Sequence, residues 1–335
     1  MDFVKEMKAK AASLQKKLVL PEGTEKRTIK AARILTDEKL CAQAILLGKE
    51  AAIRDAASGE RINLDGIKLL DPALSPDIGA YADELYNLRK HKGMTPEQAK
   101  IDITDPLRWG AMMVHMNEAD AMVAGAENTT GDVLRAGLTI IGMTSGLKTA
   151  SSCFVMTGAD SSANPFWGKE GALIFSDCAV VPDPGAEQLA DIAESAAQSC
   201  REFLGTEPVV ALLSFSTKGS AKHDDIAKVQ NAVEILKSKN VPFLFDGELQ
   251  ADAALVPSVT EQKAPGSPVM GRVNTLVFPD LGAGNIGYKL VQRLGKADAF
   301  GPFLQGFARP ISDLSRGASV EDIVVTCAVT LSRAK

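Results

Sequence analysis

The sequence has few histidines and cysteines, and none of them has a metal-binding or redox spacing. The 335-residue chain contains five cysteines and three histidines, without a Cys-x-x-Cys pair or a Cys/His cluster. Structural zinc sites and disulfide frameworks depend on such spacings, so we expect neither, and no metal site. A histidine-based catalytic triad also lacks support. We expect His91, His115 and His223 to be surface or packing residues.

Long apolar runs and blocks of positive charge are missing as well. No apolar run approaches the roughly 18 residues that a membrane-spanning helix needs. Residues 1–17 carry charges throughout, in place of the apolar centre of a signal peptide. The net charge is −5 without a basic block, which argues against nucleic acid or a membrane as a partner. We therefore expect a cytoplasmic protein that holds any anionic ligand through local positive groups.

The length and the residue pattern favour two α/β domains. Single hydrophobic cores usually stop growing at about 250–300 residues, so a chain of 335 residues predicts two. Short apolar strands alternate with helices, a pattern typical of parallel sheets covered on both faces. We expect the domain boundaries near residues 143–151 and 300–302, which makes the first domain discontinuous. The expected strands lie at 17–23, 42–48, 119–125, 151–156, 172–180, 209–215, 243–245 and 275–278.

A glycine-rich segment follows the last of these strands. Pro279-Asp280 interrupt the chain, and residues 282–287 are predicted to form a turn that opens into a helix at 288–294. Backbone N–H groups of such a turn can converge on an anion. The segment also matches the G-x-G-x-x-G pattern of dinucleotide sites. No second strand ending in an acid follows about 20 residues later, so a nicotinamide site is the weaker alternative.

Two further segments contain candidate ligand-binding residues. Residues 126–132 form a polar, hydroxyl-rich loop between a strand and a helix, where parallel α/β proteins place ligands. Arg135 follows near the start of that helix, where the dipole favours an acid, so ligand binding is as well supported as a surface role. The basic cluster 89–92 fits a solvated helix end at least equally well. A cationic turn at 214–220 could be an ordinary connection.

A serine–arginine pair lies close to the C-terminal end. Arg316 stands between Ser315 and Gly317, and its planar guanidinium can donate two hydrogen bonds to one phosphate group. Asp322 comes three residues after Ser319 and precedes an apolar run, which fits a helix capping box. On spacing alone, this structural role for Asp322 is favoured over a catalytic one.

Six segments in order along the chain resemble the motifs of the phosphate acetyltransferases (phosphotransacetylases). Together they cover nearly the whole sequence, which is far more specific than any single motif. The length is similar to that of the compact family form without N-terminal regulatory domains. The segments are Ala119–Leu138 (ADAMVAGAENTTGDVLRAGL), Ser176–Ala193, Leu213–Ala221, Phe245–Ala254, Asn274–Leu294 (NTLVFPDLGAGNIGYKLVQRL) and Gly301–Val324 (GPFLQGFARPISDLSRGASVEDIV).

The resemblance implies reversible acetyl transfer between acetyl phosphate and coenzyme A, without a metal, a bound cofactor or a covalent acyl-enzyme. It implies a homodimer and two three-layer α/β/α domains with mainly parallel sheets around a cleft, similar to the isocitrate/isopropylmalate dehydrogenase-like architecture. The first domain would comprise residues 1–145 and 300–335, and the second, residues 146–299, would provide dimerisation and one cleft wall. The alternatives are a phosphate butyryltransferase, a non-catalytic acyl-coenzyme-A-sensing module and a nicotinamide-linked dehydrogenase.

The resemblance also implies roles for individual residues. Ser315 and Arg316 fall on the family's catalytic serine–arginine pair, and Asp322 falls on its proposed base. Arg89 and Arg135 fall on positions that bind coenzyme A, with the looser match at Arg89. Further candidates for binding phosphate or substrate are Asn128, Thr130, Tyr288 and Lys289.

Overall fold

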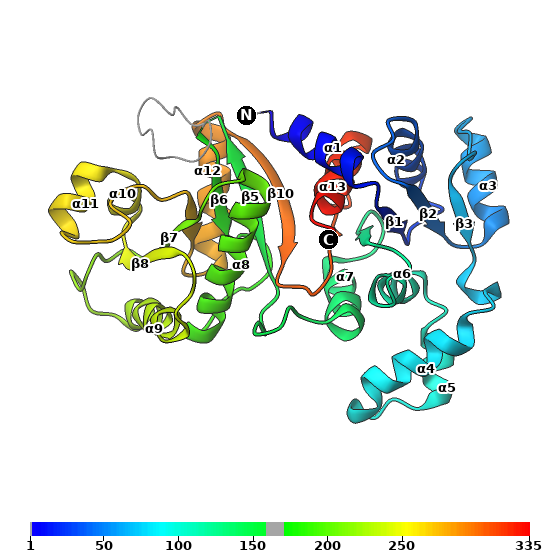
Figure 1. Ribbon diagram of the computed structural model, residues 1–335, viewed down its shortest axis with the longest axis horizontal. Helices are drawn as coiled ribbons and strands as arrows, with labels where there is room; N and C mark the ends of the chain where they lie inside the picture. Colours follow the sequence, from blue (N-terminus) through cyan, green and yellow to red (C-terminus); the bar gives the residue numbers. More distant parts are fainter. Residues whose placement is uncertain (1, 159–170) are drawn as a thin grey trace. The chain divides into compact units, whose positions relative to one another are not determined.

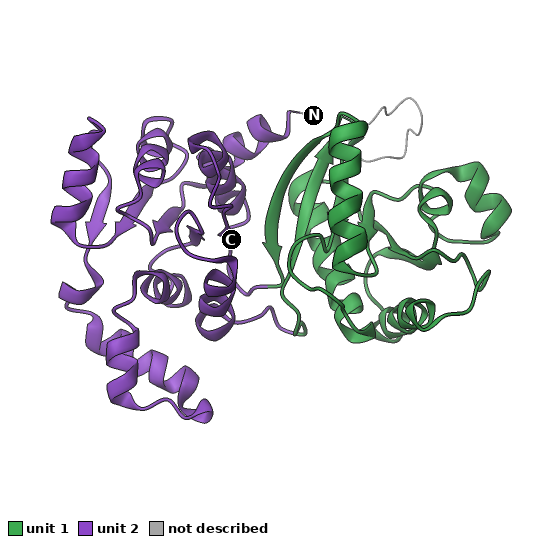
Figure 2. Ribbon diagram, turned by 180° about the vertical axis from the view of Figure 1, so that it is seen from behind, with its two compact units in different colours: residues 1, 146–306 green, residues 2–145, 307–335 purple. Residues whose placement is uncertain are grey.

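The computed structural model describes residues 2–158 and 171–335, which form two compact units (Figure 2). Unit 1 takes the described residues between 146 and 306, and unit 2 takes residues 2–145 and 307–335. The chain therefore returns to unit 2 after residue 306, and not at residue 300 as the sequence suggested. The glycine and proline at 301 and 302 lie at an irregularity inside strand β10 (Asp298–Gln305), which pairs antiparallel with β5 (Ser151–Thr157) of unit 1.

Unit 2 is built on a five-stranded sheet in the order β11-β4-β1-β2-β3. Figure 1 labels its strands β1, β2 and β3. Every neighbouring pair is parallel, so all the carboxyl ends lie at one edge. The last strand in the sequence, β11, pairs with β4 and not with its predecessor in the chain. The strands are β1 (Lys17–Leu20), β2 (Gln43–Leu47), β3 (Lys68–Leu70), β4 (Ala121–Ala124) and β11 (Ile311–Asp313).

Helices cover both faces of this sheet because successive strand residues point to opposite sides. On one face, α1 (Phe3–Leu14), α2 (Lys26–Asp37) and α13 (Val320–Ser332) bury a core that includes Leu18 and Leu20. On the other, α6 (Pro106–His115) packs against β1 and β4. The remaining helical segments are α3 (Glu50–Gly59), α4 (Ile78–Arg89), α5 (Pro96–Asp102), α7 (Thr130–Ala136), the π-helix η3 (Gly137–Ile141) and the short turns η1 (Pro72–Leu74) and η2 (Lys90–Lys92).

Unit 1 contains a six-stranded sheet in the order β10-β5-β6-β9-β7-β8. Strand β5 runs antiparallel to both of its neighbours, and the pairs from β6 to β8 are parallel. Helices α8 and α9 pack on this sheet, and a core cluster joins α10, α11 and α12 to it. The elements are β6 (Leu173–Ser176), β7 (Val209–Leu213), β8 (Leu244–Leu249), β9 (Thr275–Val277), α8 (Ala186–Leu204), α9 (Asp224–Lys239), α10 (Ala251–Leu255), α11 (Pro257–Lys263) and α12 (Leu281–Leu294).

The structure confirms a mixed α/β fold with parallel sheets and each of the eight expected strands, most of them shorter than expected. Three strands were missed: β3 and β11 have three residues each, and β10 contains a glycine and a proline. Helix α8 begins after Gly185, whose backbone N–H donates to the Gln188 side chain at 3.0 Å.

Candidate active site

The prediction of a glycine-rich turn before α12 was wrong, since the helix begins at Leu281 and contains the glycines. Asp280 is the N-cap and accepts a hydrogen bond from the Ala283 backbone N–H at 2.8 Å. A Cβ atom on Gly284 would lie 2.2 Å from the Asp177 carbonyl oxygen, and one on Gly287 would lie 3.0 Å from the Phe278 ring. Close packing therefore explains these two glycines, and neither an anion-binding turn nor a dinucleotide loop is present in this segment.

Ser315 and Arg316 lie on the exposed connection between β11 and α13 in unit 2. The Ala318 backbone N–H donates to the Ser315 carbonyl at 2.9 Å, and the Gly317 N–H donates to the Ser315 hydroxyl at 3.2 Å. The guanidinium of Arg316 has no ion-pair or hydrogen-bond partner among the described residues. The loop is thus ordered by its backbone, and the Arg316 side chain is left available to a ligand.

Arg27 of α2 stabilises the Ser315–Arg316 connection by hydrogen bonds to its backbone. Its guanidinium donates to the carbonyl oxygens of Arg316 and Ala318, both at 2.8 Å, and to that of Ala126 at 3.2 Å. Its Nε also donates to Glu25 at 2.8 Å. Although burial raises the pKa of Glu25, the hydrogen bonds from Arg27 and Thr28 hold it below its ordinary value. One arginine therefore joins the Ser315–Arg316 connection to the loop after β4.

Glu22 fixes that second loop through a buried carboxylate. The residue is 5% exposed, and its oxygens accept from the backbone N–H groups of four consecutive residues, Gly125 to Asn128, at 2.8–3.1 Å. The Asn128 side-chain amide donates to it as well, at 2.8 Å. The sequence analysis missed both Glu22 and Arg27, because their partners lie about 100 and 290 residues away along the chain.

The capping role predicted for Asp322 is confirmed. Its Oδ2 accepts from the Ser319 backbone N–H and from the Ser319 hydroxyl, both at 2.8 Å, and the Asp322 N–H donates to the Ser319 hydroxyl at 3.2 Å. The carboxylate is exposed at the first turn of α13. Its other oxygen remains available, so a cap and a proton acceptor are compatible in this position.

A pocket of about 460 Å³ in unit 2 brings together Arg89, Arg135 and Asn128, three of the residues predicted to bind ligand. It also contains Arg108 of α6, which the sequence analysis missed. Arg108 lies in the first turn of a helix, where an acid is expected, so a dipole argument could have found it. The same argument was wrong for Arg135, which lies in the last turn of α7 and not near its start. The remaining lining residues are Leu85, Met94, Asp102, Asp105, Leu107, Asp132, Ala136 and Thr139.

The arginines of this pocket retain donors for a ligand. Arg108 lies 3.6 Å from Asp102, and Arg135 lies 3.6 Å from Asp132. These separations are longer than those of strong charge-assisted hydrogen bonds, which are about 2.7–2.9 Å. Arg89 has no ion pair among the described residues. Three guanidinium groups around one cavity are suited to a ligand with several phosphate groups.

Two further predicted residues, Tyr288 and Lys289, belong to α12 of unit 1. The Tyr288 ring stacks on Phe154 with a centroid distance of 4.0 Å, and burial raises the pKa of its hydroxyl. The Lys289 ammonium lies 5.8 Å from the Tyr288 ring centroid. These contacts give Tyr288 a packing role, and a substrate role for both residues stays a prediction.

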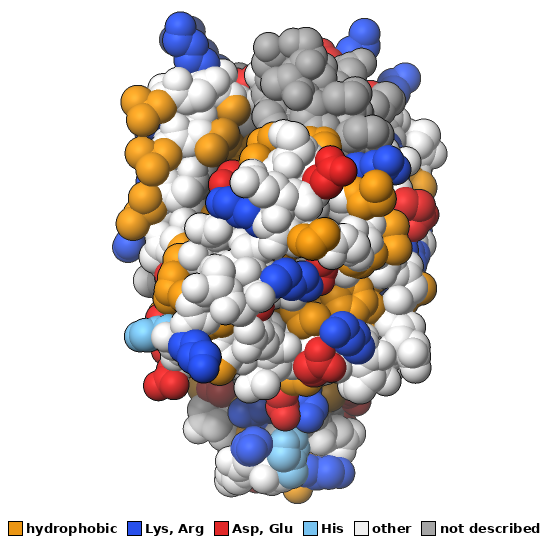
Figure 3. Space-filling model, turned by 90° about the vertical axis from the view of Figure 1, so that its left-hand side faces the viewer, with side chains coloured by type: hydrophobic (Ala, Val, Ile, Leu, Met, Phe, Trp, Pro, Cys, Tyr) orange, Lys and Arg blue, Asp and Glu red, His pale blue; other side chains and the backbone are white. Residues whose placement is uncertain are grey.

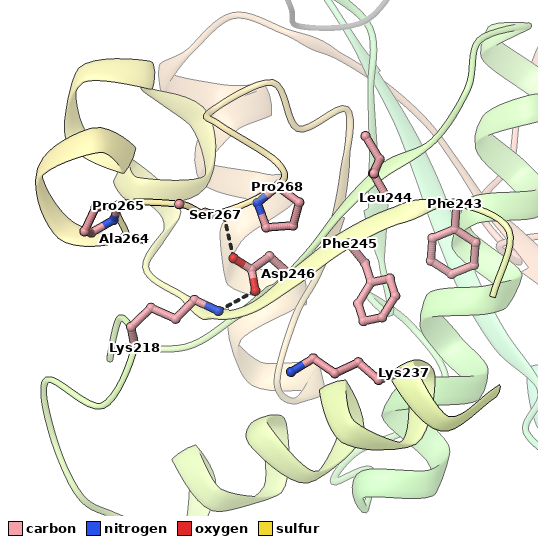
Figure 4. A pocket seen from close by; sticks show the side chains of 11 residues that line it. Lys218, Lys237, Phe243, Leu244, Phe245, Asp246, Ala264, Pro265, Ser267 and Pro268 are labelled. Atoms are coloured by element: carbon pink, nitrogen blue, oxygen red, sulfur yellow. Dashed lines mark hydrogen bonds and ion pairs between the residues drawn. The ribbon is translucent and has the colours of Figure 1, made fainter. Parts of the chain in front are cut away.

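The cationic turn at 214–220 lies in unit 1 beside a second pocket of about 630 Å³ (Figure 4). Lys218 points to the buried carboxylate of Asp246, which also accepts from Ser267, and it donates to the Gly247 carbonyl at 2.8 Å. Lys237, also at this pocket, pairs with Glu234 at 2.8 Å. The lysine charges are therefore neutralised within the protein, which supports the reading of this turn as an ordinary connection.

Basic and acidic side chains are interspersed on the face shown in Figure 3, and neither sign gathers into a large patch there. Among the described residues, no helix combines the length and hydropathy needed to cross a bilayer. Within the same part of the chain, no three or more histidine, cysteine or acidic side chains converge as a metal site would require. All five cysteines are buried thiols, and burial raises the pKa of Cys41 to about 11.

Fold and site together define a class: an α/β protein that offers exposed arginine and serine side chains near the carboxyl ends of parallel strands, as phosphate-containing ligands require. The family model described as Phosphate acetyl/butaryl transferase matches residues 2–331. The chain belongs to this family.

Relatives and solved structures agree with this assignment. The phosphate acetyltransferase of Treponema pallidum is 58% identical over 333 residues, covering 99% of this chain and 98% of that protein. That of Thermoanaerobacterium thermosaccharolyticum is 49% identical, and both chains are fully covered. A phosphotransacetylase structure from Streptococcus pyogenes superimposes with a TM-score of 0.91 at 38% identity, covering 99% of this chain and 97% of that one.

Proposed function

We propose that this protein catalyses the reversible transfer of an acetyl group between acetyl-coenzyme A and phosphate. The observation that carries the proposal is the exposed Ser315–Arg316 connection, fixed by Arg27 in a chain whose residues 2–331 match a phosphate acyltransferase family. The sulfur of coenzyme A attacks the carbonyl carbon of acetyl phosphate. The carbon–oxygen bond to phosphate breaks, phosphate leaves with the electron pair, and the thiol proton passes to a base.

Arg316 and Ser315 have distinct tasks in this step. The guanidinium binds the phosphoryl group and neutralises the charge that develops on the leaving phosphate. The Ser315 hydroxyl already accepts from the Gly317 N–H, so its own proton is free to be donated to phosphate or to the developing oxyanion. Both interactions strengthen as negative charge develops in the transition state, which is the condition for accelerating the reaction.

Asp322 is the proposed base, and its environment favours one of two routes. A free thiol has a pKa of about 8.5 and an ordinary aspartate about 3.9, so complete proton transfer before attack costs roughly 6 kcal/mol. The two hydrogen bonds from Ser319 to Oδ2 stabilise the ionised carboxylate. We infer that the free oxygen of Asp322 takes the proton as sulfur bonds to carbon, so that a free thiolate never forms.

The Asp322→Asn variant separates the two roles of this residue. We expect kcat to fall by about 10²-fold, since general-base catalysis contributes at least that much. The free energy of unfolding should fall by at most about 1 kcal/mol, the usual cost of a lost cap. Steady-state kinetics and urea unfolding measure the two effects. A normal kcat with reduced stability would leave Asp322 as a cap alone.

We further propose that the pocket containing Arg89, Arg108 and Arg135 binds the phosphate groups of coenzyme A, with Asn128 as an additional donor. The Arg108→Gln variant should raise KM for coenzyme A about tenfold and leave kcat nearly unchanged, because this contact is equal in the ground and transition states. The matched control is Arg54→Gln, an exposed arginine of α3 paired with Glu50. Equal KM values in the two variants would contradict the assignment.

The test of the whole proposal is the formation of a thioester on mixing coenzyme A and acetyl phosphate, followed by absorbance with a chelator present. We expect turnover with and without the chelator. Faster reaction with butyryl phosphate would favour the phosphate butyryltransferase alternative. Binding of acetyl-coenzyme A without turnover would instead indicate a sensing module.

A homodimer in the cytoplasm is part of the proposal. Helix α12 exposes four large apolar side chains, at fractions between 36% and 79%, on one stripe: Ile286, Leu290, Val291 and Leu294. Such a stripe on a helix surface marks an interaction site, and a second copy of this chain is the occupant that the resemblance implies. Light scattering measures the mass in solution, and a monomer would contradict this part of the proposal.

A further inference from the structure

The buried carboxylate of Asp313 has no role in the chemistry described so far. It ends strand β11, directly before the Leu314–Ser315–Arg316 connection, and the residue is 7% exposed. Its Oδ2 lies 2.6 Å from the Thr130 hydroxyl oxygen. Its Oδ1 is buried without a hydrogen-bond partner among the described residues. A carboxylate buried with one oxygen unpaired is unusual, because an unsatisfied buried polar group is costly.

Asp313 Oδ1 has no hydrogen-bond partner in the described part of the chain because a backbone segment covers it. A Cβ atom on Gly125 would lie 2.5 Å from Oδ1, so the backbone of the loop after β4 lies directly against this oxygen. Gly125 also has a φ of +114°, which side chains rarely allow. Thr130 therefore provides the one side-chain hydrogen bond that the described residues give to Asp313, and the Leu314 backbone N–H adds a weaker stabilisation of its charged form.

The surroundings raise the pKa of Asp313 above that of an ordinary aspartate. Burial raises its pKa to about 6, and the Glu22 carboxylate acts in the same direction. All four residues of the neighbouring strand β4 are apolar. Helix α13 contacts β11 through the hydrogen bond between Thr330 and Ser312. Charged groups on the neighbouring elements include Arg27, Glu127, Asp132, Arg135, Arg316 and the two acids Glu321 and Asp322 of α13.

The Thr130 hydroxyl has a single proton, which it can donate either to Asp313 or to a bound anion, but not to both. When Asp313 is ionised, Thr130 must donate to Oδ2 and can offer a ligand only lone pairs. When Asp313 is protonated, it donates to the Thr130 oxygen, and the Thr130 proton becomes free for an anion. The state of the buried acid thus decides whether Thr130 can bind phosphate as a donor.

We propose that Asp313 and Thr130 form a proton-coupled anion site, in which a phosphate group bound at Thr130 is accompanied by uptake of one proton on Asp313. The identity of the anion rests on the proposed function. The proton comes from solvent and bonds to the carboxylate, and the Thr130 O–H turns from Asp313 to an oxygen of the anion. No covalent bond to the ligand forms or breaks. Asp313 is a positioning residue that acts through Thr130.

The experiment is calorimetric titration of the whole protein with sulfate, whose charge is constant between pH 5 and pH 9, in two buffers of different ionisation enthalpy. With a pKa of about 6, Asp313 is mostly ionised at pH 7. The wild-type protein should therefore take up nearly one proton per sulfate bound. Its affinity should also fall about tenfold between pH 7 and pH 8.

Three variants test the roles of Asp313 and Thr130, and a fourth serves as control. Asp313→Asn cannot be protonated, so uptake should vanish and the affinity should become independent of pH over this range. Thr130→Val should bind sulfate weakly, whereas Thr130→Ser should bind and take up the proton normally. Glu127→Gln should keep the uptake, although burial raises the pKa of Glu127 as well. Circular dichroism confirms that each variant is folded.

The outcomes separate this inference from the proposed function. No proton uptake in the wild-type protein, or uptake that persists in folded Asp313→Asn, overturns the coupling even if thioester forms normally. Proton uptake without thioester formation would support the coupled site and contradict the acetyl transfer.

Discussion

The Arg316→Gln variant is expected to lose about 10³-fold in kcat/KM with no measurable loss of stability. The guanidinium is exposed and has no partner among the described residues, so its removal leaves no buried group unsatisfied. The loop itself is held by Arg27 through the carbonyl oxygens of Arg316 and Ala318, which the substitution leaves in place. The lost activity therefore reports charge stabilisation of the leaving phosphate, where one donor is worth about 10²–10³-fold.

Steady-state kinetics with varied acetyl phosphate and urea unfolding test this expectation together. Arg316→Lys is the informative control, because it keeps the charge and loses the planar two-donor fork. We expect it to recover part of the activity. A near-normal kcat/KM for Arg316→Gln would remove this residue from the mechanism.

The Glu22→Gln variant is expected to have the largest effect on folding, lowering the free energy of unfolding by about 3–5 kcal/mol. The substitution keeps the size of the side chain, removes its charge and turns one acceptor oxygen into a donor. Five N–H groups converge on the carboxylate, and each one left unsatisfied costs roughly 1–3 kcal/mol. Activity should fall as well, because the same loop carries Asn128 and Thr130.

The midpoint of urea unfolding measures this loss. Glu60→Gln is the matched control, since Glu60 is an acid of the same unit whose partners are the exposed lysines Lys26 and Lys30. Surface ion pairs contribute about 0–1 kcal/mol, so this control should change the midpoint little. Equal midpoints in the two variants would mean that the loop after β4 does not depend on Glu22.

The sequence predicted the strands that form the centres of the sheets and failed where an element depends on its partner. Continuous apolar runs identify β1, β2, β4 and β7 because both faces of these strands are buried. Strand β11 consists of Ile-Ser-Asp and becomes a strand only by pairing with β4. The glycines of α12 fit a turn equally well in sequence, and only their contacts with Asp177 and Phe278 favour a helix.

The residues of the candidate site were likewise predicted only in part from the sequence. Motifs identify Ser315, Arg316 and Asp322, whose neighbours in the sequence are distinctive. Glu22, Arg27 and Asp313 were missed, because each acts on a loop that is distant along the chain. A lone acid or arginine beside a strand has many possible partners, so its role becomes visible only in the folded structure.

The positions of β11 and α13 near the end of the chain affect how the protein folds during synthesis. Both follow unit 1 in the chain, yet β11 completes the sheet of unit 2 and α13 covers the helix α1. During synthesis, residues 2–145 therefore cannot complete their sheet until the whole of unit 1 has left the ribosome. Until then the edge of β4 is unpaired and an apolar face is uncovered. A nascent chain halted before residue 307 would have no Ser315–Arg316 loop and would expose surfaces that chaperones bind.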